Sequence, residues 1–390
     1  MLPRLRPSSY TENYLQNTNA NYTMFCSFQK QDVPNFLPSS IANQAIIGTS
    51  YKEDNVNVKH WNRLLGQIMY IQDLLSWNQF DDEHLSFFRT IGIDYLCLDI
   101  RSMHRMDGEL DLRENGDNTN FFEVAKAKVE SHGMLLHSVF MASWDEITLA
   151  MPDRDEKIEA WCQMIRNIGS VGIPALGYNF KPMGNFRTPP KTGRGGAKYS
   201  TFDFDEFDRN RPQSRQTTVS ENQMWEHMTY FLERVIPVAE QAGVRMALHP
   251  DDPPIPEPLA GVAQIASTLD QYRQIFDIVL SEANGMLFCQ GCVTEMGVNV
   301  YDAIAEMGSQ NKIIFVHFRN VRGVLPYFQE VFLDEGDIDM HRAMRVYRDV
   351  GFTGPFMMDH TPQFAQQQAG WAGRAYAVGY IRGLIQSVYR

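Results

Sequence analysis

The chain has 390 residues, of which 44% are hydrophobic, and a formal net charge of −12 at pH 7. This acidic balance argues against nucleic acid or an anionic membrane surface as the partner. The length suits one large α/β barrel or two ordinary domains. No apolar run approaches the roughly 20 residues that span a bilayer, and the first residues lack the apolar core of a secretory signal, so we expect a cytoplasmic protein.

Residues 1–60 are rich in Asn, Ser, Gln and Tyr and show weak periodicity. We interpret them as an extension or arm that contacts the domain or a partner subunit. From residue 61 to 390, strands and helices alternate. The expected strands are 66–71, 93–100, 134–140, 173–180, 244–248, 285–290, 312–318 and 355–359, and the expected helices are 81–90, 121–131, 153–169, 220–241, 268–282, 337–351 and 374–388.

This succession contains no returning hairpin in our interpretation, so it predicts a closed (β/α)8 TIM barrel. Ser220 and Gln223 form a capping box for the fourth helix, which Gly243 ends, and Asp337 is the expected cap of the helix that Gly351 closes. The basic, glycine-rich stretch 181–201 is typical of a lid or binding loop, although a solvated insertion would look the same.

Metal-binding residue types stand where four consecutive strands end. In VRMALHPDDPP, an apolar run stops at His249, and Pro250 prevents the strand from continuing. Cys289, His317 and Asp359 occupy the same place in the next three strands. Any one of them could be a core residue, but barrel strands converge at this rim. The four together predict a metal site, and this ligand set suits zinc and manganese alike.

Five cysteines, at positions 26, 97, 162, 289 and 292, fit no disulfide framework or zinc-ribbon spacing. Reduced thiols are therefore expected. Cys289 and Cys292 form a C-x-x-C, but Gln290 and Gly291 between them are unlike a thioredoxin motif, which makes redox use the weaker interpretation.

The chain resembles the mannonate dehydratase family over most of residues 152–383. The resemblance rests on PDRDEKIEAW at 152–161, GYNFKP at 177–182, the run from VSENQMWEH to LHPDDPP ending at 254, ANGMLFCQG at 283–291, VHFRNVRG at 316–323, GDIDM at 336–340 and MDH at 358–360. Members of this family are metal-dependent barrels of the xylose-isomerase-like kind, which dehydrate D-mannonate to 2-keto-3-deoxygluconate, typically with manganese, in glucuronate catabolism.

The resemblance implies the metal ligands His249, Cys289, His317 and Asp359, and it selects Cys289 over Cys292 because Cys289 matches the family's F-C-x-G. The expected ion is Mn2+, with Fe2+, Zn2+ or another divalent ion as alternatives. From the chemistry of dehydration we expect a catalytic set of His360, Asp359 and Arg319, in which Arg319 pairs with the substrate carboxylate and His360 is the acid/base group or, alternatively, a residue that orients Asp359. The expected substrate contacts are Arg319, Asn320, Asn179 and Asp251, although Asp251 could equally belong to a structural turn.

The sequence departs from the family where proton transfer is supported. The family's C-terminal pattern carries a tyrosine, whereas residues 369–375 read AGWAGRA and the first tyrosine is Tyr376. Trp144 in MASWDE stands where the family has a histidine, and the family's F-H-E is Phe328-Gln329-Glu330. These changes indicate a relative with another substrate or another proton route.

The first hypothesis is therefore a metal-dependent hydro-lyase acting on a sugar acid, with no nucleic-acid or membrane partner. The resemblance also implies a homo-oligomer, such as a dimer. The alternatives are a metal-dependent sugar isomerase or epimerase, which would use the same ion to polarise a carbonyl and a hydroxyl, and a non-catalytic metal-bound barrel.

Overall fold

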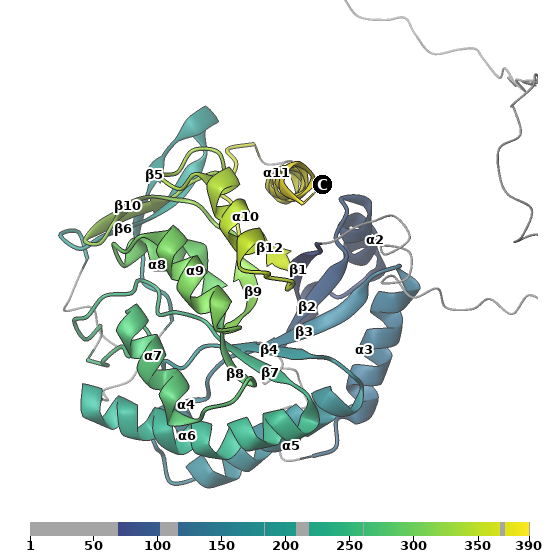
Figure 1. Ribbon diagram of the computed structural model, residues 1–390, viewed down its shortest axis with the longest axis vertical. Coiled ribbons are helices and arrows are strands. Elements are labelled where there is room, and N and C mark those ends of the chain that lie inside the picture. Colours follow the sequence, from purple (N-terminus) through teal and green to yellow (C-terminus); the bar gives the residue numbers. More distant parts are fainter. Residues whose placement is uncertain are drawn as a thin grey trace, which may run out of the picture. The chain divides into compact units, whose positions relative to one another are not determined.

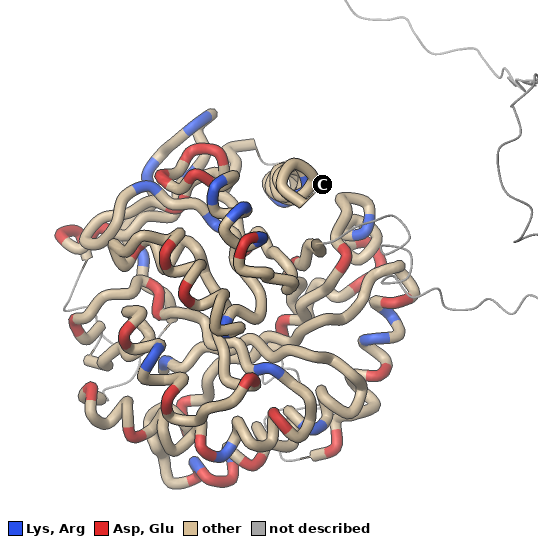
Figure 2. The backbone as a smooth tube through the Cα atoms, viewed as in Figure 1, with Lys and Arg blue, Asp and Glu red and all other residues tan. Residues whose placement is uncertain are grey.

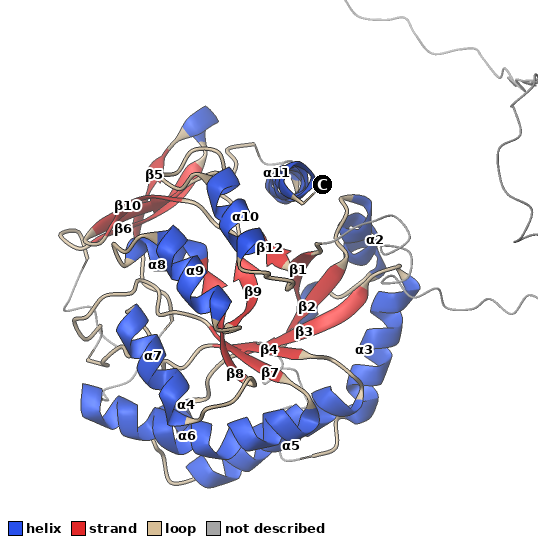
Figure 3. Ribbon diagram, in the orientation of Figure 1, coloured by secondary structure: helices blue, strands red, loops and turns tan. Residues whose placement is uncertain are grey.

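The computed structural model describes residues 69–101, 116–182, 184–207, 218–259, 261–366 and 371–389. Eight parallel strands close into a barrel in the order β1-β12-β9-β8-β7-β4-β3-β2, with helices around them (Figure 1, Figure 3). The barrel strands are β1 (Ile71–Ser76), β2 (Tyr95–Asp99), β3 (Leu135–Met141), β4 (Ala175–Tyr178), β7 (Arg245–Leu248), β8 (Asn284–Cys289), β9 (Ile313–His317) and β12 (Phe356–Met357). The predicted (β/α)8 barrel is confirmed. The expected extension over residues 1–60 lies outside the described residues, so its boundary stays a prediction.

The helices follow the strands in alternation. They are α2 (Asp82–Thr90), α3 (Thr119–Ser131), α4 (Asp145–Thr148), α5 (Arg154–Ser170), α6 (Glu221–Ala242), α7 (Leu269–Ile278), α8 (Gln290–Glu295), α9 (Val300–Ser309), α10 (Met340–Asp349) and α11 (Ala372–Val388), with two short 3-10 turns, η1 (Trp77–Gln79) and η3 (Arg194–Gly196). Acidic and basic residues are interspersed along these elements (Figure 2). Within the described segments, no helix combines the length and apolarity needed to cross a membrane.

The barrel has two apolar layers. Large side chains such as Phe140, Phe315 and Met357 meet small ones such as Ala175 in one buried cluster formed by the barrel strands and α8. Gly177 makes this packing feasible, because a Cβ there would lie 2.7 Å from the Phe140 ring and 2.9 Å from the Phe315 ring. The larger apolar layer lies between the strands and the surrounding helices and includes the buried face of α6.

Local signals explain where α6 begins and ends. Ser220 Oγ accepts from Gln223 N, and the Gln223 side chain accepts from Ser220 N at 3.0 Å, so the predicted capping box is confirmed. Gly243 closes the helix with φ +68°, a left-handed conformation that glycine adopts without strain. The next strand, β7, starts two residues later and carries the chain to His249.

Several sequence predictions are wrong in detail. The first strand was expected at 66–71, but β1 begins at Ile71. The cap of α10 is Asp339, which accepts from Arg342 N at 2.9 Å, whereas Asp337 accepts from Gly323 N at 2.7 Å. Helix α7 ends at Ile278 instead of 282, and α4, α8 and α9 were not expected.

The expectation of no returning hairpin is also wrong. Strands β5 (Thr188–Thr192), β6 (Lys198–Asp203), β10 (Val321–Val324) and β11 (Tyr327–Glu330) form a second, antiparallel sheet in the order β10-β11-β6-β5. The stretch predicted as a loop at 181–201 therefore contains strands. Phe202 of β6 stacks on Phe328 of β11 with 5.8 Å between ring centroids, which supplies the apolar contact that a two-stranded hairpin alone lacks.

Candidate metal centre

The four predicted ligands lie on four neighbouring strands of the barrel. His249 follows β7, Cys289 ends β8, His317 ends β9, and Asp359 lies two residues beyond β12. In the β8–β9 register Cys289 stands opposite His317, and in the β9–β12 register His317 stands opposite Met357. The parallel register therefore brings residues from 249 to 359 to one rim.

The side chains converge as the strand ends do. The candidate donor atoms of Cys289, His317 and Asp359 lie within 4.8 Å of one another, and those of His249, Cys289 and Cys292 do as well. His317 Nδ1 is 3.4 Å from Asp359 Oδ1, and the rings of His249 and His317 are 5.2 Å apart. Both ring nitrogens of His317 are buried, and neither makes a hydrogen bond of good geometry, Nδ1 having only the 3.4 Å ion-pair contact with Asp359. Buried polar atoms without a partner are costly, so this arrangement fits a site built to hold an ion.

The two cysteines of the C-x-x-C differ electrostatically. Burial raises the pKa of the Cys289 thiol, but the hydrogen bond from Cys292 and the charge of Arg319 outweigh it, and the net pKa is lowered well below its usual value. Burial and the neighbouring Cys289 raise the pKa of Cys292 well above its usual value. Cys289 is thus favoured as the thiolate, the form that binds metal ions.

Asp359 combines a lowered pKa with an unusual backbone conformation. Burial raises the pKa of its carboxyl, but the charges of His317 and His360 outweigh burial and bring the pKa well below its usual value. The carboxylate form is therefore favoured. Asp359 has φ +66°, which is uncommon for a residue other than glycine. Such conformations concentrate at functional sites, where the surrounding structure holds them.

Arg319 is the cation at the centre of the site, with only 2% of its side chain exposed. Its Nη2 donates to Cys292 Sγ at 3.0 Å, to Glu295 Oε1 at 3.1 Å and to Cys289 Sγ at 3.5 Å, and its Nη1 donates to Glu330. These contacts engage its Nη1 and Nη2 groups with the protein itself. They favour a role in holding the thiolate and carboxylates over the predicted contact with a substrate carboxylate.

A second arginine extends this charge network into the antiparallel sheet. Arg187, just before β5, donates to Asp252 Oδ2 at 2.7 Å and also to Glu330, the last residue of β11. Burial raises the pKa of Asp252, but Arg187 and Arg319 outweigh it and lower the pKa to about 2. The sheet thus connects to the candidate metal ligands through buried ion pairs.

His360 is the exposed member of the group, with 47% of its side chain accessible. Its Nε2 lies 3.4 Å from Asp359 Oδ2, 3.5 Å from Glu330 Oε2 and 3.4 Å from Arg319 Nη1. A solvent-accessible imidazole between two carboxylates can take up and return a proton.

Three expected substrate contacts are engaged by the protein. Asn320 donates to Leu333 O and Ile338 O at 2.8 and 3.1 Å and is 1% exposed. Asp251 accepts from Ala266 N at 2.7 Å and from Ser267 Oγ, which supports its alternative role in a structural turn. Asn179, after β4, accepts from Ser143 N at 3.2 Å and is only partly buried.

The sequence prediction missed several groups around the centre. Glu295 comes from the unexpected α8, Arg187 was part of a stretch noted only as basic, and Glu330 was noted only for its place in a motif. The only feature of these three residues that the sequence displays is their charge. No local pattern identified the partner with which each residue pairs. Asp73 in β1 and Arg101 after β2 were also missed. Burial raises the pKa of Asp73, with a small addition from Asp359. Burial lowers the pKa of Arg101, but Asp99 outweighs it and raises that pKa, again with a small addition from Asp359.

Comparison with known proteins identifies the family to which this geometry belongs. The family described as D-mannonate dehydratase (UxuA) matches residues 110–214 and 202–390. The chain belongs to the D-mannonate dehydratase family. Mannonate dehydratase 2 of Halalkalibacterium halodurans is 28% identical over 299 residues, which cover 67% of this chain and 85% of that protein.

Solved structures agree with this family assignment. The mannonate dehydratase of Streptococcus suis serotype 2 superposes with a TM-score of 0.71 at 25% identity, covering 82% of this chain and 93% of that one. A xylose isomerase domain protein of Planctomyces limnophilus has a TM-score of 0.55 at 14% identity, covering 83% and 98%, which shows the fold alone. Mannonate dehydratases are hydro-lyases, so the enzyme class expected from the sequence is confirmed.

The residues that depart from the mannonate dehydratase pattern have packing roles here. Trp144 is buried and packs edge-on against Trp161 of α5 at 5.8 Å. Trp371 packs on Phe87 of α2 at 4.2 Å, and Tyr376 Oη donates to Asp334 Oδ1 at 2.6 Å. These contacts give both tryptophans structural partners and connect Tyr376 to a surface carboxylate.

Proposed function

We propose that this protein dehydrates D-mannonate, or a closely related aldonate, to a 2-keto-3-deoxy sugar acid with a bound divalent ion. The observation that carries the proposal is the convergence of Cys289, His317 and Asp359 beside the exposed His360. We further propose manganese as the native ion, with Fe2+ or Zn2+ as the alternatives, because two imidazoles, a thiolate and a carboxylate form a mixed ligand set that borderline divalent ions accept.

The ligands proposed for the ion are His249, Cys289, His317 and Asp359. A divalent ion bound there supplies Lewis-acid stabilisation of the negative charge that develops on substrate oxygens. The lowered pKa values of Cys289 and Asp359 provide two anionic donors near neutral pH. Arg319 holds the Cys289 thiolate and the carboxylates of Glu295 and Glu330 in place. This positions the ligands before substrate binds.

His360 is the proposed acid/base group. Its Nε2 takes the proton α to the substrate carboxylate and can return it to the hydroxyl on the neighbouring carbon, which leaves as water. The elimination therefore releases no proton to solvent, because the proton taken from carbon leaves with the hydroxyl as water. Glu330 and Asp359, within 3.5 Å of this nitrogen, stabilise the protonated imidazole that forms in between. This route needs no side chain at the positions of Trp144 and Trp371.

The experiment is a semicarbazide assay for the α-keto acid product. The protein is loaded with Mn2+, its metal content is measured, and D-mannonate is tested beside a panel of other aldonates. Formation of the keto acid from one aldonate, lost in His360→Gln at unchanged metal content, supports the proposal. Stoichiometric metal without turnover of any aldonate refutes it, and an epimerised or isomerised product would favour the isomerase alternative.

A further inference from the structure

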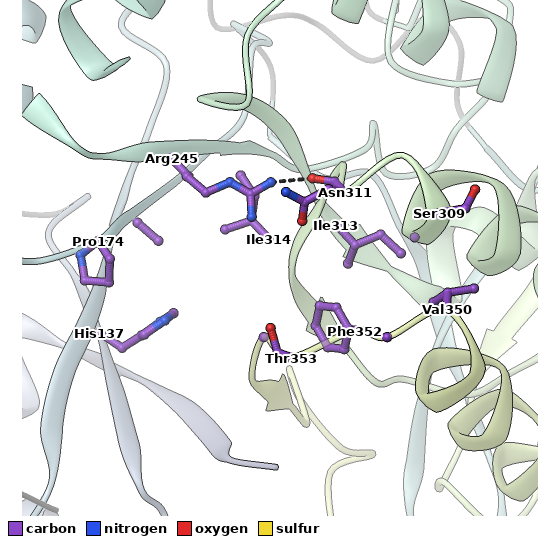
Figure 4. Close-up of a pocket in the computed structure, with 14 residues that line it drawn as sticks. His137, Pro174, Arg245, Ser309, Asn311, Ile313, Ile314, Val350, Phe352 and Thr353 are labelled. Atoms are coloured by element: carbon purple, nitrogen blue, oxygen red, sulfur yellow. Dashed lines mark hydrogen bonds between the residues drawn. The ribbon is translucent and has the colours of Figure 1, made fainter. Parts of the chain in front are cut away.

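A cavity of about 440 Å³ lies at the end of the barrel opposite the metal centre. Its lining includes Arg245, Ala175 and Ile313, which are the first residues of β7, β4 and β9, together with His137 and Phe352 (Figure 4). Small-molecule pockets typically measure about 300 to 1,000 Å³, so the space suits a small metabolite. Catalysis in TIM barrels takes place at the other end, and this cavity is outside the proposed active site.

Arg245 is the charged group of this cavity. Its Nε donates to Glu282 O at 3.0 Å, and its Nη2 donates to the carbonyl of Asn311 (Figure 4). These are its hydrogen bonds within the described part of the chain, so Nη1 and one N–H of Nη2 are available. An arginine offers five N–H donors in a planar fork that matches an oxyanion.

The pairing of Arg245 differs from that of other partly buried arginines. Arg187, Arg374 and Arg382 each pair with a buried carboxylate, Asp252, Asp73 and Asp94 respectively. Arg245, in contrast, has only carbonyl partners within the described part of the chain. Carbonyl groups satisfy hydrogen bonds but do not neutralise the charge.

A second cation, Lys312, lies near Arg245 but outside the lining of the cavity. Lys312 Nζ donates to Ser281 O and Asn284 O at 3.1 and 3.0 Å and lies 4.9 Å from the Phe276 ring centroid. Burial lowers the pKa of Lys312 and the charge of Arg245 lowers it further, whereas the charges of Asp277 and Glu282 raise it in part. Burial likewise lowers the pKa of Arg245, with the exposed Glu282 giving a partial offset.

We propose that this cavity binds the oxyanion group, phosphate or carboxylate, of a small metabolite, with Arg245 as the residue that recognises it. The bound anion pairs with the guanidinium of Arg245, whose hydrogen bonds within the described part of the chain go only to carbonyls. The apolar and hydroxyl side chains of the lining, such as Ile314 and Thr353, contact the remainder of the ligand. The ligand therefore binds at the end of the barrel opposite the one where the proposed dehydration takes place.

The test uses the metal-loaded full chain and inorganic phosphate and acetate as probes, measured by isothermal titration calorimetry. Arg245→Gln removes the fork, and we expect phosphate to bind about tenfold or more weakly, as for the loss of a charge-assisted hydrogen bond. Asn311→Asp is isosteric, tolerates the φ of +54°, and adds a negative charge to the cavity lining at the residue whose main-chain carbonyl accepts from Arg245. This variant should weaken phosphate binding to a similar degree. It provides the test of the proposal if Arg245→Gln fails to fold.

The matched control is Arg234→Gln on α6, since Arg234 also donates to a carbonyl, Tyr230 O at 2.9 Å. It should leave phosphate binding unchanged. Binding of phosphate alone assigns the cavity to phosphorylated ligands, and binding of both probes extends it to carboxylates. The proposal is overturned if neither probe binds, or if phosphate binds equally to the wild type, Arg245→Gln and Asn311→Asp.

Discussion

Arg319 Nη2 donates to Cys292 Sγ across 3.0 Å, and the two side chains are buried together beside the proposed metal ligands. This contact distinguishes the cysteines of the C-x-x-C. Cys292 is engaged by the guanidinium and has a raised pKa, whereas the pKa of Cys289 is lowered. The lowered pKa of Cys289 makes it the more favoured thiolate of the two and supports it as the proposed ligand.

Replacing Cys289 by Ser should abolish stoichiometric metal binding, because a serine hydroxyl is a poor ligand at neutral pH. Cys292→Ser should retain close to one equivalent of bound metal per chain, because the serine hydroxyl can still accept from Arg319 and donate to Cys289. Inductively coupled plasma mass spectrometry after dialysis measures the difference. Equal losses in the two variants would contradict the assignment of Cys289 as the ligand.

His360→Gln should lower kcat by about 10² to 10⁴, the usual contribution of a general acid/base, and leave metal content unchanged. The imidazole is exposed, so the variant is expected to fold. Steady-state kinetics on the aldonate identified in the semicarbazide assay provide the measurement. A kcat within about threefold of wild type would show that another group moves the proton.

Asp252→Asn should reduce the free energy of unfolding at pH 7 by roughly 2 kcal/mol, since the carboxyl pKa lies about two units below its usual value. A lowered folded-state pKa stabilises the protein above the unfolded value of about 4, and this contribution is lost as pH falls towards 2. The difference in the free energy of unfolding between the variant and the wild type should therefore become smaller at acidic pH.

Urea unfolding of metal-free protein at pH 7 and at pH 3 tests this dependence. Asp205→Asn is the control, because Asp205 is exposed, and should change little at either pH. A constant gap between Asp252→Asn and wild type at both pH values would mean that the ion pairs with Arg187 and Arg319 do not set the pKa.

Asn320→Ala should destabilise the fold by roughly 3 kcal/mol, because it leaves buried groups of Leu333 and Ile338 without partners. In the folded variant, KM should change less than about threefold, since the amide is 1% exposed. Denaturant unfolding and kinetics give the two readouts. Asn299→Ala removes an exposed helix cap and should cost only about 1 kcal/mol. A large rise in KM at unchanged stability would instead restore the predicted substrate contact.

The sequence alone determined features whose causes are local. An apolar run that stops at Pro250 marks a strand end wherever it occurs, so His249 was correctly expected at the exit of its strand. The capping box of Ser220 with Gln223 depends on residues three apart, and it predicted the start of α6. Alternation of strands and helices then implied the barrel, and the barrel implied that the ends of β7, β8, β9 and β12 meet.

Only the tertiary structure decided which charges meet inside the site. Glu330 reaches Arg187 across 143 positions, through the pairing of β6 with β11, and no periodicity predicts such a non-local antiparallel pair. The family resemblance made Asn320 an expected substrate contact, but its amide hydrogen-bonds with Leu333 and Ile338 of a loop that packs against it. Burial and distant partners set these roles, and both are properties of the folded chain that the order of residues does not display.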